Sequence, residues 1–423
     1  MATNSPVYPT APVAPRRVSP LDRLQGWLPK LVLAPSVVVV LFCMYGYIGW
    51  TLLLSFTNSR FMPSYKWAGL SQYQRLWDND RWWVASKNLL LFGGSFIAIC
   101  LVLGVFLAVL LDQRIRREGF IRTLYLYPMA LSMIVTGTAW KWLLNPGLGL
   151  DKLLRDWGWE GFRFDWLVDP ERVVYCLVIA AVWQASGFVM ALFLAGLRGV
   201  DPAIVRAAQV DGASLPTIYL RIVLPSLRPV FFSALMILAH IAIKSFDLVA
   251  AMTAGGPGYS SDLPAMFMYA HTFTLGKLGL ANTTSGLVLV HVIYGLAFTT
   301  LFFRNYFVAI PDALVKAARL DGAGFFTIFL RILLPMSTPI VMVCLIWQFT
   351  QIWNDFLFGV VFASGDSQPI TVALNNLVNI TTGVKEYNVD MAAAMIAALP
   401  TLVVYVLAGK YFVRGLTAGA VKG

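Results

Sequence analysis

One segment occurs twice, at a fixed distance, in a chain that is otherwise mostly apolar. Residues 203–229 read AIVRAAQVDGASLPTIYLRIVLPSLRP, and residues 313–339 read ALVKAARLDGAGFFTIFLRILLPMSTP. Of the 27 aligned positions, 15 are identical at an offset of 110 residues. A repeat of this size is a supersecondary unit that one chain builds more than once. Any fold for this chain must therefore contain two copies of one local structure.

The residue types in the repeat predict a short helical hairpin. Asp201 can cap a helix whose first turn holds Pro202, because the carboxylate accepts from orphan amides and proline lacks one of them. Gly212 and Gly322 can adopt the left-handed conformation that ends such a helix. Pro216 then opens a second short helix that ends near Pro225 in the first copy. The hairpin is too polar to lie in lipid, so it is expected outside the membrane.

The composition places the rest of the chain in a membrane. Hydrophobic residues make up 58% of the sequence, charged residues only 13%, and the mean hydropathy is +0.71. These values exclude an ordinary soluble domain. The net charge of +11 does not indicate nucleic-acid binding, because the basic residues are spread between the apolar runs. The four cysteines fall in four different apolar runs and are interpreted as packing residues.

Eight apolar stretches of about 20 residues or more are long enough to cross a bilayer as helices. The predicted fold is therefore an all-α polytopic membrane protein of about eight transmembrane helices with two polar loops on one side. The predicted spans are Leu31–Phe56, Asn88–Leu111, Thr123–Leu144, Val173–Leu197, Val230–Ala254, Ser285–Phe303, Ile340–Ala363 and Met391–Val413.

The distribution of basic residues gives the orientation. With the N-terminus inside, each of the first four cytoplasmic segments carries four Lys or Arg, whereas the last two external segments carry one each. This asymmetry is the positive-inside pattern. We expect both termini and both repeats in the cytoplasm. Residues 1–30, rich in Pro, Ser and Thr, are expected to form a disordered cytoplasmic tail.

The repeat also carries a motif. From Ala207 to Pro225 and from Ala317 to Pro335, the spacing of Ala-Ala, Gly, Ile and Leu-Pro resembles the "EAA" loop of permease subunits of bacterial binding-protein-dependent ABC importers, especially sugar importers. The resemblance implies that this loop couples the permease to an ATPase subunit. Arg206 and Lys316 stand where the family has Glu, so the family's ion pair is not expected here. The alternative is two generic basic loops. The coupling-loop candidates are Ala207, Ala208, Asp211, Gly212, Arg221, Pro225, Ala317, Ala318, Asp321, Gly322, Arg331 and Pro335.

This resemblance implies partners and excludes catalysis by the chain itself. A cytoplasmic ABC ATPase dimer would bind ATP and Mg, and a periplasmic sugar-binding protein would deliver the sugar to a permease in the bacterial inner membrane, surrounded by lipid. Resemblance to glucose- and mannose-type importers implies a monosaccharide. The sequence has no G-x-x-x-x-G-K-[ST] phosphate loop. We expect no cofactor, metal site, catalytic residue or nucleic-acid partner in this chain.

The two halves resemble two different permease partners. Residues 31–275 contain loop 201–229 and then SFDLVAAMTAGGPGYSSD, which resembles the first partner's signature. Residues 282–423 contain loop 311–339 and then WNDFLF, which resembles the second partner's signature. Only two predicted spans separate the loops, where two complete subunits would need six. The chain is therefore interpreted as an in-frame hybrid joined near Thr274–Asn282, with four spans missing.

Polar residues in the spans are candidates for a sugar path, since ionisable groups in lipid are costly. The candidates are Lys244, Asp247, Trp353, Asn354 and Asp355. Lys244 and Asp247 are three residues apart and could pair on one helix. A structural ion pair and an interfacial Asp would explain the charged members without a path.

Two other functions stay open from the sequence. Asp247 or Asp355 could serve as the proton site of an ion-driven secondary transporter. Alternatively, the hybrid could bind the ATPase without transporting anything. The sequence also leaves open whether the chain works with a second permease chain or with a copy of itself.

Overall fold

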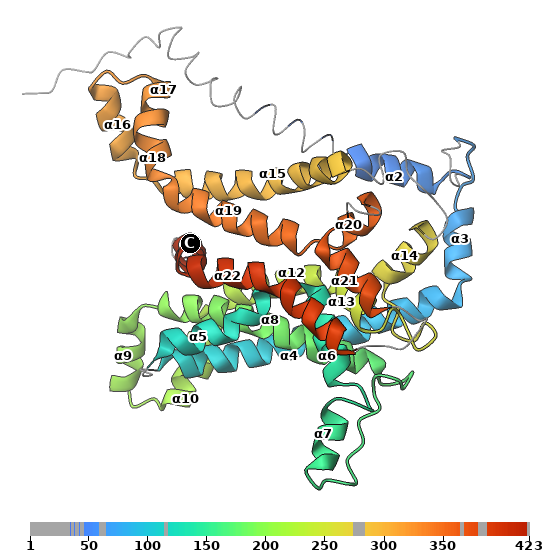
Figure 1. The fold of residues 1–423 in the computed structure, drawn as a ribbon. Coiled ribbons are helices and arrows are strands. Elements are labelled where there is room, and N and C mark those ends of the chain that lie inside the picture. Colours follow the sequence, from blue (N-terminus) through green and yellow to red (C-terminus); the bar gives the residue numbers. More distant parts are fainter. Residues whose placement is uncertain are drawn as a thin grey trace, which may run out of the picture.

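The computed structural model describes residues 46–58, 65–113, 117–273, 284–363, 368–379 and 387–420, together with positions 34, 38 and 42. The regular elements among these residues are helices (Figure 1), so the predicted all-α class is confirmed. The predicted tail 1–30, the start of the span Leu31–Phe56 and the predicted join at Thr274–Asn282 lie outside the described residues.

The first half is built around one long helix, α8, at Val173–Arg198. Its residues are apolar on every face, and 17 of its 26 side chains are buried. The long helix α4, Asp80–Asp112, packs along it. Gly104 of α4 permits this approach, because a Cβ there would clash with Val189 of α8. The other helices before the first repeat are α2 Tyr47–Ser55, α3 Ser71–Trp77, α5 Glu118–Leu126, α6 Met133–Leu143 and α7 Leu150–Asp156.

Three helices have the length and composition to cross a membrane: α4, α8 and the part of α22 at Tyr387–Val406. Three further pairs pass only as bent units, which would raise the number of spans to six. The predicted span Thr123–Leu144 is one of these pairs: Glu118–Ala130 and Met133–Leu143 meet at 99°. The break lies at the 3-10 turn η2 Tyr127–Ala130, where Ser132 caps α6. The predicted count of eight spans is therefore not confirmed by the described residues.

The repeat extends well beyond the 27 aligned residues. In the first copy, the helices are α9 Pro202–Val210, α10 Leu215–Ile218, a π-helical turn Tyr219–Val223, α11 Leu224–Ser226, α12 Arg228–Ile243 and α13 Asp247–Met252. In the second copy they are α16 Asp312–Leu320, α17 Phe325–Ile328, a π-helical turn Phe329–Leu333, α18 Leu334–Met336, α19 Thr338–Trp353 and α20 Leu357–Phe362. Every boundary is offset by 110 residues.

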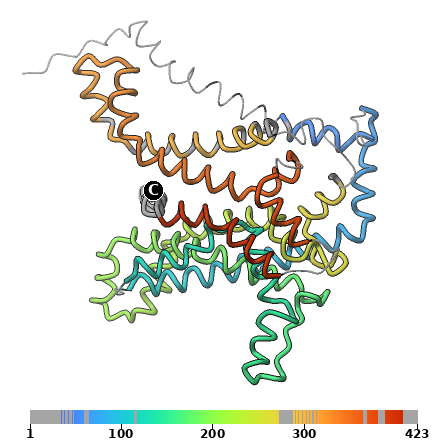
Figure 2. The backbone as a smooth tube through the Cα atoms, viewed as in Figure 1, coloured from blue at the N-terminus to red at the C-terminus, as the bar shows by residue number. Residues whose placement is uncertain are grey.

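The remaining helices are α14 Pro264–Phe273, α15 Thr284–Ala309, α21 Ile370–Val378 and α22 Tyr387–Ala420. Helix α22 lies between α19 and the first half, because it packs against α19 on one side and against α6 and α8 on the other. Figure 2 shows the same arrangement, with α15 and α19 forming a layer on the far side of α22 from the first half. The late part of the sequence thus closes over the early part.

One hydrophobic cluster joins the halves. It contains Ile134, Phe246 and Ala250 from the first half and Phe356, Val372 and Ala397 from the second. The rings of Phe246 and Phe356 stack with their centroids 5.7 Å apart. These two residues are 110 positions apart, so each contacts its own counterpart in the repeat. The contact therefore lies beside the axis that relates the two copies.

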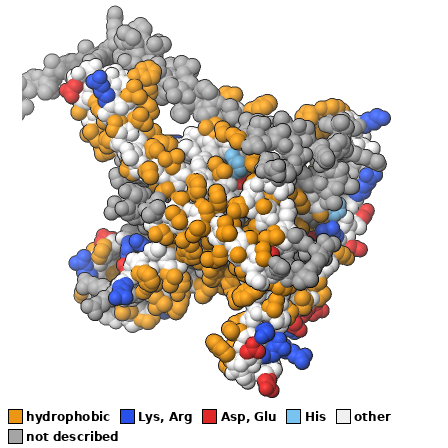
Figure 3. Space-filling model, in the orientation of Figure 1, with side chains coloured by type: hydrophobic (Ala, Val, Ile, Leu, Met, Phe, Trp, Pro, Cys, Tyr) orange, Lys and Arg blue, Asp and Glu red, His pale blue; other side chains and the backbone are white. Residues whose placement is uncertain are grey.

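The surface matches a membrane protein. In Figure 3, apolar side chains cover the middle of the molecule, and charged side chains gather at the loops beyond the helix ends. Both repeat hairpins, α9–α11 and α16–α18, lie at one end of the bundle, at the left of Figure 1. The arrangement agrees with the prediction that both hairpins face the same side of the membrane.

Candidate functional site

The first hairpin of the repeat forms as its residues predict. The Asp201 side chain accepts a hydrogen bond from the Ala203 amide at 2.8 Å, and Pro202 occupies the first turn of α9. Gly212 has φ +78°. Its amide donates to the Gln209 carbonyl, and the Ala213 amide donates to the Ala208 carbonyl at 3.0 Å. This pair of bonds is a Schellman motif, which satisfies the last carbonyls of α9.

The second hairpin repeats this turn with a different start. Gly322 has φ +82°, and the Ala323 amide donates to the Ala318 carbonyl at 2.9 Å. Pro311 occupies the cap position of α16 and provides no side-chain hydrogen bond, unlike Asp201. The equal turns and unequal caps show that glycine, not the cap, determines the shape of the hairpin.

Most predicted coupling residues present their side chains to solvent. The exposed ones are Ala207, Asp211, Gly212, Arg221, Ala317, Asp321, Gly322, Arg331 and Pro335, while Pro225 is half-buried. Ala208 and Ala318 are buried at 8% and 7% exposure, because each faces the interior of its own hairpin. Exposed and buried alanines alternate in the same way in both copies, so each hairpin offers the same outer face to a partner.

The two hairpins differ in what supports them. Tyr219 donates its hydroxyl to Asp112 of α4 at 2.9 Å, and Ala208 and Ile218 belong to the main core cluster of the first half. The counterpart of Tyr219 is Phe329, whose ring lies 6.4 Å from Phe307 of α15. Among the described residues, the first hairpin therefore packs on the main core cluster, whereas the second is held to α15 by the Phe329 ring contact and by the Tyr306 hydroxyl, which donates to the Met336 carbonyl at 2.5 Å.

The predicted pairing of Lys244 with Asp247 is not found. Helix α12 ends at Ile243 and Asp247 begins α13, so the two residues do not share one helix. The Lys244 ammonium instead donates to the Tyr294 hydroxyl of α15 at 3.1 Å and lies 4.9 Å from the centre of that ring. Lys244 thus connects α12 to the second half.

The predicted path residues of the second half all make structural contacts. Trp353 donates its indole N–H to the Ala397 carbonyl of α22 at 2.9 Å. Asn354 donates its side-chain amide to the Ala130 carbonyl of η2 at 3.3 Å. Asp355 accepts from the Gly359 amide at 2.9 Å and so caps α20. His291 Nε2 lies 3.5 Å from the same carboxylate. These contacts join helices and do not place the three side chains around a common cavity.

The Gly-Gly-Pro-Gly segment after α13 is fixed by a buried carboxylate. The side chain of Asp262 is fully buried and pairs with Arg81, while Asn88 donates to the Asp262 carbonyl at 3.0 Å. Burial raises the pKa of the Asp262 carboxyl above its usual value, and the guanidinium of Arg81 opposes this rise. Gly255, with φ +87°, lies directly against the carboxylate. The segment is therefore held to the start of α4.

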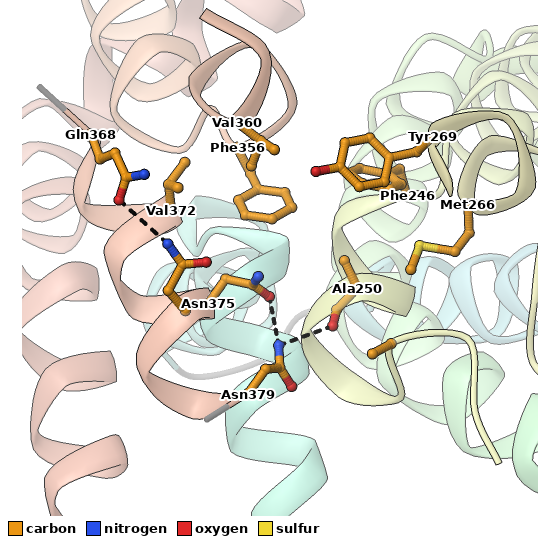
Figure 4. Close-up of a pocket in the computed structure, with 12 residues that line it drawn as sticks. Phe246, Ala250, Met266, Tyr269, Phe356, Val360, Gln368, Val372, Asn375 and Asn379 are labelled. Carbon is orange, nitrogen blue, oxygen red and sulfur yellow. Dashed lines mark hydrogen bonds between the residues drawn. The ribbon is translucent and has the colours of Figure 1, made fainter. Parts of the chain in front are cut away.

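A cavity of about 300 Å³ lies between the two halves, and the sequence did not indicate it. Figure 4 shows amide side chains on one side and aromatic side chains on the other. Its lining residues are Phe246, Ala250, Ala254, Met266, Tyr269, Phe356, Val360, Gln368, Val372, Asn375, Asn376 and Asn379. The predicted path residues are absent from this lining. The Asn-Asn pair at 375 and 376 was the available signal, within a segment of otherwise apolar character.

A sequence model described as "Binding-protein-dependent transport system inner membrane component" matches the chain twice, at residues 101–270 and 263–417. Each match contains one copy of the repeat. The chain belongs to this family. It is therefore a transport permease and not an enzyme, and the resemblance inferred from the EAA spacing is confirmed at the level of the family.

Two relatives show how far the similarity to other permeases extends. This permease is 34% identical over 257 residues to the xylose/arabinose import permease protein XacH of Haloferax volcanii, which covers 60% of this chain and 80% of that protein. It is 48% identical over 150 residues to the probable ABC transporter permease protein PH1216 of Pyrococcus horikoshii. That match covers 35% of this chain and 54% of the relative.

A solved structure shares the fold of this permease. The crystal structure of a bacterial ABC transporter that imports the acidic polysaccharide alginate has a chain that matches with a TM-score of 0.53 at 21% identity. The match covers 60% of this permease and 87% of that chain. The arrangement of helices is therefore that of a permease of known fold over more than half of the chain.

Proposed function

We propose that this permease is the membrane component of an ATP-driven carbohydrate importer, in which its two hairpins dock onto a separate ATPase dimer. The observation that carries the proposal is the duplicated hairpin: two exposed outer faces with the same backbone, at one end of the bundle. Closure of the ATPase dimer on ATP would move both hairpins together. The hinge-like breaks after α11 and α18, bent by 67° and 65°, would pass that movement to α12 and α19.

The finer assignments rest on the sequence and on the relatives. We propose a monosaccharide such as glucose or mannose as substrate, delivered by a periplasmic binding protein to a permease in the inner membrane with both termini in the cytoplasm. One relative is a xylose/arabinose import permease and the similar solved structure is an alginate importer, which supports a carbohydrate substrate. ATP and Mg would be bound by the ATPase, outside this chain.

We also propose that the chain joins parts of two permease partners, residues 31–275 and 282–423. The double match to one family supports this division, since the second match begins near the proposed join. In this proposal each ATPase subunit receives one hairpin from the same chain.

Each coupling residue has a proposed role. Gly212 and Gly322 form the turn. The small side chains of Ala207 and Ala317 would allow the ATPase surface to approach the backbone of the docking helix closely. Polar contacts to the ATPase would come from four exposed side chains, Asp211, Arg221, Asp321 and Arg331. In place of the family's Glu, exposed Arg206 and Lys316 would meet the ATPase surface.

The test is to replace both turn glycines in the full chain with proline, Gly212→Pro with Gly322→Pro. Proline fixes φ near −65° and cannot adopt the observed +78° and +82°. The misfit costs about 3 kcal/mol or more per turn, which lowers the population of the docking conformation ~100-fold. We expect the ATPase no longer to co-purify with the permease, and ATP hydrolysis to lose its response to sugar and binding protein.

Gly324→Pro is the matched control, because Gly324 already has φ −75° and has open space around its Cβ position. ATPase docking unchanged in the double variant would refute the proposal. Sugar uptake that persists after ATP depletion and stops with an uncoupler would show a secondary transporter instead. ATPase co-purification without sugar accumulation would show a hybrid that docks but does not transport.

A further inference from the structure

The cavity between the halves has the size and the boundaries of a small-molecule site. Its volume of about 300 Å³ is at the lower end of the range for ligand pockets. Phe246 and Phe356 are counterparts in the repeat, and so are Ala250 and Val360; all four line the cavity. The cavity therefore lies beside the axis of the repeat and exists only when both halves are in contact.

One wall of the cavity is a row of carboxamides on and next to α21. Asn379 donates to the Ala250 carbonyl at 3.4 Å and to the Asn375 side-chain oxygen at 3.0 Å. Asn376 donates to the Gln368 side-chain oxygen at 3.3 Å. These bonds fix the side chains and leave the amide nitrogens of Asn375 and Gln368 without a hydrogen bond to any described residue. Those two groups can donate to a ligand.

The opposite wall is aromatic. Phe246 stacks on Phe356, and Tyr269 lies against Phe246 with the ring centroids 4.7 Å apart (Figure 4). Amide groups can both donate to and accept from hydroxyls, and flat apolar rings suit the C–H face of a sugar ring. The two walls together fit a compact ligand that has hydroxyls on its edge and an apolar face.

Among the described residues, none that lines the cavity is Asp, Glu, Lys, Arg or His. Lys141 donates from its ammonium to the side-chain oxygen of Asn379, a lining residue, at 3.0 Å. Lys141 is engaged there and does not line the cavity. An anionic ligand would have to bury its charge without a cation to pair with it, which is costly.

We propose that this cavity is a binding site for an uncharged monosaccharide-sized carbohydrate, selected against uronates and sugar phosphates, on the side of the bundle opposite the hairpins. The site rests on the proposed function and adds to it the charge class of the substrate and the residues that recognise it. Asn375 and Gln368 bind the hydroxyls, Phe246 and Tyr269 hold the apolar face, and both halves contribute to the site.

The experiment uses the full chain in lipid nanodiscs and measures dissociation constants by ligand-detected NMR, with glucose and xylose as neutral probes and glucuronate as the anionic probe. The unaltered chain is expected to bind a neutral probe at least about tenfold more tightly than glucuronate. Asn375→Ala is expected to weaken neutral binding about tenfold. The matched control is Asn388→Ala, an exposed asparagine with no hydrogen bond among the described residues and outside the cavity.

A second variant tests the role of charge by placing a cation in the carboxamide wall. Gln368 lies at the edge of the cavity and is only half-buried, so Gln368→Lys can fold. We expect this variant to reverse the preference, with glucuronate gaining about tenfold over the neutral probes. Equal binding of neutral and anionic probes by the unaltered chain, binding unaffected by Asn375→Ala, or no binding at all would each overturn the inference. ATPase co-purification, measured on the same samples, tests the proposed function separately.

Discussion

At the residue scale, the Trp-Asn-Asp-Phe signature was readable as a motif but not as a set of contacts. Its four residues extend in four directions: Trp353 to α22, Asn354 to η2, Asp355 to its own helix α20 and Phe356 to Phe246. Polarity within an apolar run indicated that these side chains matter. The partners of Trp353, Asn354 and Phe356 lie 44 or more positions away, and local sequence carries no information on that pairing.

Asp262 gives a prediction that depends on pH. Because burial raises the pKa of its carboxyl, the folded protein binds this proton more tightly than the unfolded chain does. The contribution of Asp262 to stability therefore falls as pH rises from about 4, the ordinary value for Asp, through the raised pKa. Asp262→Asn stays neutral and lacks this dependence. We expect the thermal midpoint of the variant to rise relative to the unaltered protein as the pH increases above about 4.

The measurement is thermal unfolding followed by tryptophan fluorescence at several pH values. Asp78→Asn is the control, since Asp78 lies in the same external region and has no ion pair among the described residues. If Asp262→Asn instead loses stability relative to the unaltered protein as pH rises, attraction to Arg81 outweighs the cost of burial, and the prediction is wrong.

At the element scale, the hairpins were predictable because glycine, proline and capping residues determine them locally. The breaks after α12 and α19 were not. Lys244–Phe246 and Asn354–Phe356 contain no glycine or proline, and both runs read as continuous spans. The chain leaves the helix there because long-range contacts stabilise the break, including the Lys244 bond to Tyr294 and the stacking of Phe246 on Phe356. The predicted spans through Ala254 and Ala363 therefore run past these breaks.

The unequal support of the two hairpins can be measured by hydrogen exchange. Tyr219→Phe removes the bond to Asp112, worth about 1 kcal/mol, and makes the first hairpin resemble the second. Amides of α9–α11 are expected to exchange about fivefold faster in this variant. In the unaltered protein, α16–α18 should already exchange faster than α9–α11.

Phe329→Tyr is the reciprocal control, because it adds a hydroxyl at the matching position of the second copy, where the described ring contact is with Phe307 and not with a carboxylate. It should leave exchange in α16–α18 unchanged. Equal exchange rates in the two hairpins of the unaltered protein would contradict the unequal support inferred from the contacts.

At the scale of the whole molecule, composition and charge predicted a helical membrane protein, and the repeat predicted two related parts. How the parts meet was beyond the sequence, because the cluster that joins them uses ordinary apolar residues such as Ile134, Val372 and Ala397. The predicted count of eight spans stays unconfirmed among the described residues, since hydropathy registers length and not the bends that divide three of the helix pairs. The cavity was missed because its walls come from two segments, residues 246–269 and 356–379, that are distant in the sequence.

The shared cluster predicts that the halves stay together without a covalent link. A protease site inserted at residues 275–282, cut after purification, should give two fragments that co-elute in size-exclusion chromatography in mild detergent. Phe246→Ala with Phe356→Ala removes the stacked pair at the centre of the cluster and should cost ~3–5 kcal/mol per ring. In that variant the cut fragments should separate. Fragments that separate without the substitutions would show that the linker, not the cluster, holds the halves together.

The different bracing of the two hairpins has a mechanical consequence. A hairpin packed on a large core, such as α9–α11, moves as a rigid body with that core. A hairpin with fewer described contacts, such as α16–α18, can bend locally. If both hairpins were displaced equally, α9–α11 would transmit more work to the membrane helices. Part of the work applied to α16–α18 would be stored as local bending of that hairpin. The two ATPase subunits proposed to dock onto this chain would therefore do unequal work on it. Movement of the first hairpin would then determine the rate of the transport cycle.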